Sequence, residues 1–118
     1  MKKSLVIPIL NNEYKVIVSW GDLKYTKNLM RIWGYKDPAE QKDLDNRRGV
    51  CFYNKECVPV IVLPRFPKTA EEIGTLAHEA FHAINNIFEK LDEPIHDEVF
   101  AHSIGAVVRQ VLSVKKKK

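Results

Sequence analysis

The sequence predicts an α+β domain in which a three- to four-stranded twisted sheet is followed by two long helices. Two pairs of β-rich stretches, each joined by a short polar turn, predict the strands. Helical spacing of apolar residues in the second half predicts the helices. With 118 residues, 45% of them hydrophobic and 29% charged, the chain is expected to form one globular domain over residues 1–114 and a basic tail over 115–118.

The first pair of predicted strands covers residues 5–10 and 14–20, and an Asn-Asn-Glu segment between them predicts a hairpin. A glycine ends the second strand. Asp22, the next residue, can cap a helix over about residues 23–33. Residues 36–48 carry charges of both signs and are predicted to form a loop.

The second pair of predicted strands covers residues 49–53 and 57–63. Pro59 lies within the latter. Because proline cannot donate a ladder hydrogen bond, this strand is expected at an edge of the sheet, or with the side that carries the proline uncovered. Cys51 and Cys57 are too few for a disulfide scaffold, so both are expected to be reduced. A cross-strand disulfide between them is the alternative.

A capping box begins the first long helix. Thr69 is expected as N-cap, with Glu72 reaching back to its amide, and the helix should continue to about Leu91. One face of it is apolar, formed by Ile73, Leu76, Ala77, Ala80, Ile84, Ile87, Phe88 and Leu91. A last helix is expected over about residues 95–114, with Pro94 close to its first turn.

The first long helix contains the motif H-E-x-x-H, formed by His78, Glu79 and His82. Residues four apart lie on one face of a helix, so the two imidazoles can bind a single ion. Glu79 would lie beside that ion, where its carboxylate can take a proton from an activated water. The pattern therefore predicts a catalytic zinc site.

A catalytic zinc usually takes three protein ligands, and the last helix can supply the third. The candidates there are His96, Asp97, Glu98 and His102. Glu98 is preferred, because the sixteen residues from His82 allow the helix to end and the chain to return antiparallel. Small residues at Ala101 and Gly105 would let the two helices approach closely. His102 is the alternative ligand, which would give a three-histidine site.

His78-Glu79-Ala80-Phe81-His82 followed by Asp97-Glu98-Val99-Phe100-Ala101 resembles the gluzincin branch of zinc metallopeptidases. The similarity is strongest to the minimal single-domain members, including small zincin-like proteins encoded by phages and prophages. It spans residues 57–112 and includes the Ile73–Ala77 lead-in to the motif.

This resemblance implies a zincin-like domain that holds one zinc ion per chain through His78, His82 and Glu98. It implies that Glu79 is the general base and acid of peptide-bond hydrolysis. The substrate would be an extended peptide or protein that pairs with an edge strand. The counterpart of that edge strand here is residues 58–63, including Val58, Val60 and Val62.

One departure from the family concerns the residue four positions after the ligand glutamate. Larger members have an aspartate there, which accepts a hydrogen bond from a zinc-bound histidine; this chain has His102. A donor for the developing oxyanion is also required. The candidates are Tyr53, His96, His102 and Arg109.

The alternative to a peptidase is a zincin-fold binding or regulatory module that holds zinc with little or no proteolysis, because so short a chain builds only one wall of a cleft. A nucleic-acid partner is disfavoured. Residues 115–118 are four lysines and account for the whole net charge of +4. A terminal run of lysines is usually solvated. No apolar run approaches the length of a membrane span, and a cytoplasmic location is expected.

Overall fold

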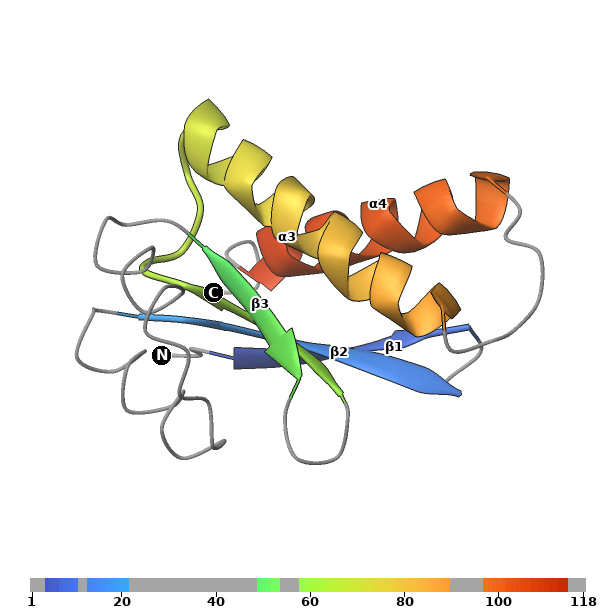
Figure 1. The fold of residues 1–118 in the computed structure, drawn as a ribbon. Coiled ribbons are helices and arrows are strands. Elements are labelled where there is room, and N and C mark those ends of the chain that lie inside the picture. The colour runs from blue at the N-terminus through green and yellow to red at the C-terminus, as the bar shows by residue number, and fades with distance from the viewer. Residues whose placement is uncertain (1–3, 11–12, 22–48, 54–57, 90–96, 115–118) are drawn as a thin grey trace.

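The computed structural model describes residues 4–10, 13–21, 49–53, 58–89 and 97–114. They form an α+β domain, as predicted: a four-stranded mixed sheet with two helices across one of its faces (Figure 1). The predicted helix at 23–33, the loop at 36–48 and the tail at 115–118 lie outside the described residues.

The predicted strand pairs are confirmed. β1 (Ser4–Ile9) pairs antiparallel with β2 (Tyr14–Trp20), and β3 (Val50–Tyr53) pairs antiparallel with β4 (Pro59–Leu63). The two pairs join through β2 and β4, which run parallel and place Ile17 opposite Val60. The strand order is therefore β1-β2-β4-β3.

The prediction that residues 58–63 form an edge strand is wrong. β4 hydrogen-bonds to β2 on one side and to β3 on the other, and all five of its residues are buried. Pro59 is the first residue of β4, a position where a proline is tolerated in an interior strand. Within the described residues, the edge of the sheet on this side is β3, which packs against the first long helix.

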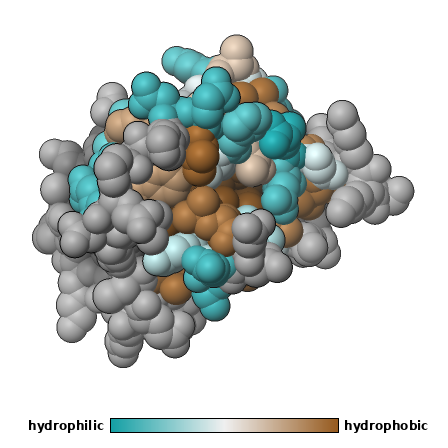
Figure 2. Space-filling model, turned by 90° about the vertical axis from the view of Figure 1, so that its right-hand side faces the viewer, coloured by the Kyte–Doolittle hydropathy of each residue, from teal (hydrophilic) through white to brown (hydrophobic). Residues whose placement is uncertain are grey.

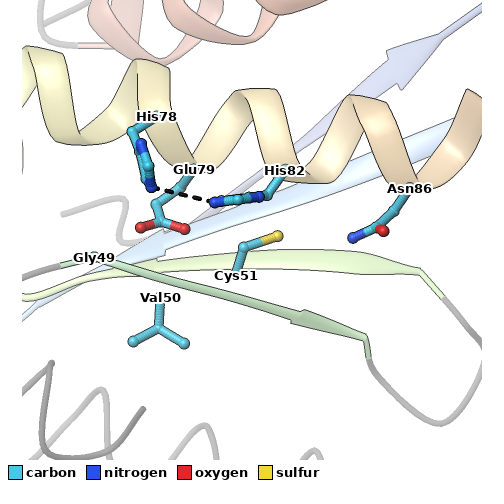
Figure 3. Close-up of a pocket in the computed structure, with 7 residues that line it drawn as sticks. All are labelled: Gly49, Val50, Cys51, His78, Glu79, His82 and Asn86. Carbon is cyan, nitrogen blue, oxygen red and sulfur yellow. Dashed lines mark hydrogen bonds between the residues drawn. The ribbon is translucent and has the colours of Figure 1, made fainter.

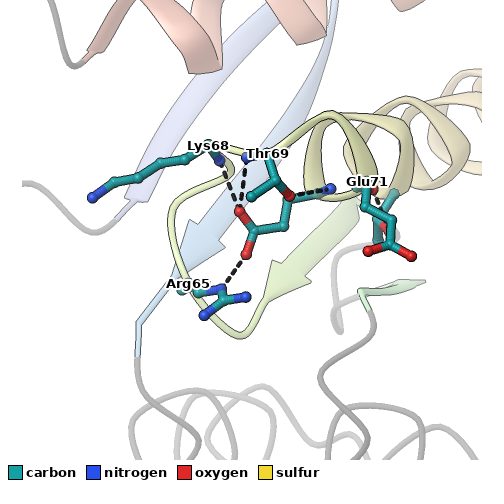
Figure 4. Close-up of polar contacts among 6 residues, drawn as sticks. Arg65, Lys68, Thr69 and Glu71 are labelled. Carbon is teal, nitrogen blue, oxygen red and sulfur yellow. Dashed lines mark hydrogen bonds and ion pairs between the residues drawn. The ribbon is translucent and has the colours of Figure 1, made fainter.

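That helix, α3 (Ala70–Glu89), begins at the predicted capping box (Figure 4). The amide of Glu72 donates to Thr69 Oγ1 at 3.1 Å, and the amide of Thr69 donates to Glu72 Oε1 at 3.0 Å. Glu72 Oε1 also accepts from the amide of Lys68, and its other oxygen pairs with Arg65. These contacts, the Thr69 amide first, lower the pKa of Glu72 to about 2.

The last helix, α4 (Asp97–Ser113), runs back along α3 in the opposite direction (Figure 1). The ring of Phe100 packs edge-to-face against both Phe81 and Phe88 of α3, with centroids 5.5 Å apart in each pair. The predicted close approach of the helices at Ala101 and Gly105 is wrong. Ala101 is exposed, and a Cβ on Gly105 would meet only the side chain of Arg109 on its own helix.

The core lies between the sheet and the two helices. It contains Ile7, Ile9, Val16, Val18, Trp20, Ile61, Leu63, Leu76, Ala80, Ala83, Ile84, Ile87, Phe88, Val107 and Val111. A view onto the right-hand side of Figure 1 shows a central patch of hydrophobic side chains bordered by hydrophilic ones (Figure 2). Among the described helices, none combines the length and the apolar character needed to cross a membrane.

Candidate metal site

The two motif histidines bring their ε nitrogens together on one face of α3. His78 Nε2 and His82 Nε2 lie 3.2 Å apart, and the ring planes are nearly perpendicular at 84°. Two nitrogens that bind one tetrahedral zinc ion at about 2.05 Å lie about 3.3 Å from each other. The pair therefore fits two ligand positions of a single ion. Without an ion, the same contact is a hydrogen bond if only one of the two ε nitrogens carries a proton.

The histidines border a pocket of about 280 Å³ between α3 and β3 (Figure 3). It is lined by Gly49, Val50, Cys51, His78, Glu79, His82 and Asn86. Both histidine rings are exposed, so an ion and a small ligand could reach them from solvent.

Glu79 lies between the histidines and the sheet and is 9% exposed. Figure 3 shows its carboxylate on the pocket side of the helix, below the ring of His78 and above Gly49. Thus His78, Glu79 and His82 are brought together as the motif predicted. A carboxylate there can exchange protons with a water or substrate group in the pocket.

Gly49 allows β3 to begin close to α3. A Cβ at this position would lie 2.9 Å from Leu63 Cδ2, 3.0 Å from Thr75 Cγ2 and 3.1 Å from Glu79 Cγ. All three separations are tighter than ordinary van der Waals contact, so a larger residue would displace its neighbours. The sequence reasoning assigned no role to this glycine beyond the start of a strand.

Two polar groups in the pocket, Cys51 and Asn86, were also missed. Side chains alternate along a strand, and in β3 Val50 points away from α3 while Cys51 points towards it (Figure 3). Asn86 lies one turn after His82 on the same face, so extending the i, i+4 spacing of the motif would have found it. Its neighbour Asn85 donates instead to Glu89 at 3.1 Å on the helix surface.

The predicted residues of α4 are not brought to this pocket. Glu98 Oε2 lies 3.5 Å from His102 Nε2, and the two side chains are 89% and 77% exposed. Neither lines the pocket. Among the described residues, no three His, Cys, Asp or Glu side chains stand together as a set that could hold a metal ion.

The remaining candidates are on other elements or fall outside the described part. Arg109 lies over Gly105 on α4. The backbone of Tyr53 pairs with Pro59 in the sheet, and its side chain is outside the described part. Val60 and Val62 are buried in the interior strand β4, and Val58 immediately precedes it. His96 and Cys57 lie outside the described residues.

Comparisons of the chain with protein-family models, with curated proteins and with solved structures found no match.

Proposed function

We propose that this protein is a zinc-dependent peptidase in which His78 and His82 bind the metal. The observation that carries the proposal is the 3.2 Å separation of their ε nitrogens, which agrees with the spacing of two ligands on one tetrahedral ion. The H-E-x-x-H motif and its resemblance to gluzincins support the same conclusion.

Zinc, when bound, supplies Lewis-acid chemistry that activates water and polarises a carbonyl group. Glu79 then acts as the proton carrier. Its carboxylate accepts a proton from the attacking water and delivers it to the departing amine, so the carboxylate is regenerated at the end of the reaction. Burial of this side chain between α3 and Gly49 restricts its movement and keeps it in the pocket.

β3 is the strand against which an extended substrate would pair. It is the strand beside the pocket, and within the described residues its outer side has no neighbouring strand. An added peptide would pass below the histidine pair. In this proposal β3 takes the place of β4, which lies inside the sheet, as the strand that pairs with substrate.

The resemblance assigns the third metal ligand to Glu98. In this structure its carboxylate faces solvent beside His102, so a Glu98 ligand would require the first turn of α4 to reorient. Replacing Glu98 with Gln tests that assignment directly, because an amide oxygen is a much weaker zinc ligand than a carboxylate.

Two measurements test the proposed function. Elemental analysis of the purified protein should find about one zinc ion per chain. The Glu79→Gln variant should keep that zinc and lose hydrolysis of casein and of peptide libraries. Folded protein that takes up no zinc from zinc-containing buffer would overturn the proposal.

A zinc-binding module with little proteolysis is the second candidate. It is supported by the two converging nitrogen ligands, and it requires no proton transfer by Glu79. Equal peptide turnover by wild type and Glu79→Gln, with zinc bound to both, would support this function in place of hydrolysis.

A further inference from the structure

We propose that the thiolate of Cys51 is a ligand of the ion held by His78 and His82, so that the metal site bridges α3 and β3. The inference rests on the metal binding in the proposed function and adds a sulfur ligand to it. This ligand comes from the sheet, whereas both histidines come from one helix.

The position of Cys51 supports this role. Cys51 is half-buried in β3, and its backbone is held by the pairing of that strand with β4, where it lies opposite Ile61. Its side chain projects towards α3 and lines the same pocket as both histidines (Figure 3). Neighbouring Val50 points to the opposite side of the strand, as strand alternation requires.

Coordination requires a change in the orientation of the thiol, because in the orientation that the structure shows, Cys51 and the two histidines do not stand together as a three-residue metal-binding set. Figure 3 shows the sulfur directed between His82 and Asn86, whereas the two ε nitrogens converge on the other side of the His82 ring. A turn about the Cα–Cβ bond moves the sulfur between staggered rotamers while the strand stays in place. The pocket of about 280 Å³ leaves room for this turn.

The chemistry of the ligand set then selects the metal. Thiolate and imidazole together suit zinc, and a set of two histidines and one cysteine leaves a fourth position for water or substrate. Oxygen-preferring ions such as Mg²⁺ and Ca²⁺ would be excluded. Binding converts the thiol to thiolate and releases one proton to solvent, so charge and protons balance.

Cobalt substitution tests the inference without any measurement of catalysis. The full chain loaded with Co²⁺ should show the near-ultraviolet charge-transfer absorption of a cobalt–thiolate bond. Cys51→Ser should lose this absorption and bind zinc at least about tenfold more weakly, since even losses outside the direct ligand set cost that much. Cys57→Ser, which removes the other cysteine of the chain, should leave both measurements unchanged.

The outcomes separate this inference from the proposed function. Wild-type protein that binds Co²⁺ without thiolate absorption, while Cys51→Ser keeps its zinc affinity, would overturn the role of Cys51 and leave the zinc site intact. Loss of metal in Glu98→Gln would then identify the third ligand. Folded wild-type protein that binds neither metal would overturn both. Circular dichroism of Cys51→Ser and Cys51→Ala controls for misfolding.

Discussion

Gly49 and Glu79 are in close contact across the boundary between the sheet and α3: a Cβ on Gly49 would lie 3.1 Å from Glu79 Cγ. The general base of the proposed reaction is therefore positioned partly by a residue that has no side chain. Any substitution of Gly49 changes the space available to Glu79.

Replacing Gly49 with Ala should lower the free energy of unfolding by about 1–3 kcal/mol, because the new methyl group overpacks this boundary. Urea unfolding measures the change. Gly74→Ala is the matched control. Gly74 is exposed in α3, with nothing within 4 Å of an added Cβ. Gly74→Ala should raise the free energy of unfolding by about 0.5–1 kcal/mol, because alanine has a higher helix propensity than glycine. Equal effects of the two substitutions would contradict the contact described here.

The capping box predicts a pH-dependent contribution to stability. The pKa of Glu72 is about 2 in the folded protein against 4.5 ordinarily, so the carboxylate stabilises the fold above about pH 5. The contribution is lost as the pH falls from about 5 to about 2, because the unfolded chain binds the proton at a higher pH than the folded protein does. Glu72→Ala should cost about 1 kcal/mol at pH 7.

Urea unfolding between pH 7 and pH 3 measures this effect, and the difference between wild type and Glu72→Ala should narrow at the acidic end. Glu71→Ala removes a carboxylate from the same turn without breaking the box and should cost less. A difference between wild type and Glu72→Ala that stays constant with pH would be inconsistent with the lowered pKa.

His82 and His102 should differ in their effect on zinc content. Both are exposed helix residues with a partner four positions away, but only His82 shares the pocket and the converging nitrogens of His78. His82→Ala should lose zinc in elemental analysis, whereas His102→Ala should retain it. His102→Ala should also change the unfolding free energy by less than about 1 kcal/mol, as expected for an exposed pair. Zinc loss in His102→Ala would instead favour a three-histidine site.

Phe100 should be the main contact that attaches the start of α4 to α3. It packs against two aromatic rings, and each such pair contributes about 0.5–1.5 kcal/mol. Phe100→Leu should therefore lower the unfolding free energy by about 1–3 kcal/mol. Val99→Ala, at a neighbouring residue that is 41% exposed, should have little effect in the same thermal or urea unfolding experiment.

Local sequence signals predicted the two long helices and the strand pairs well, because their causes lie within a few residues. The capping box at Thr69 is an example: both of its hydrogen bonds join residues three positions apart. The order of the strands depends on contacts between distant residues. Pro59 was read as an edge signal, whereas the uninterrupted apolar run of β4 was the better indicator of an interior strand.

In the candidate site, too, the part that lies within one helix was predictable and the part that depends on the sheet was not. The spacing of His78, Glu79 and His82 within one helix fixed their mutual arrangement in advance. Cys51 and Gly49 join the pocket only because β3 lies beside α3, and no local pattern carries that information. Glu98 was placed by analogy with a family; in this structure its side chain lies beside His102.

The location of both histidines on one helix has a consequence for affinity. Their nitrogens are 3.2 Å apart once α3 has formed, so an ion bound by one nitrogen would meet the second at a high effective concentration. The entropy lost in bringing the two ligands together is lost when the helix folds, before any metal arrives. If β3 supplied a further ligand, the bound ion would cross-link α3 to the edge strand of the sheet.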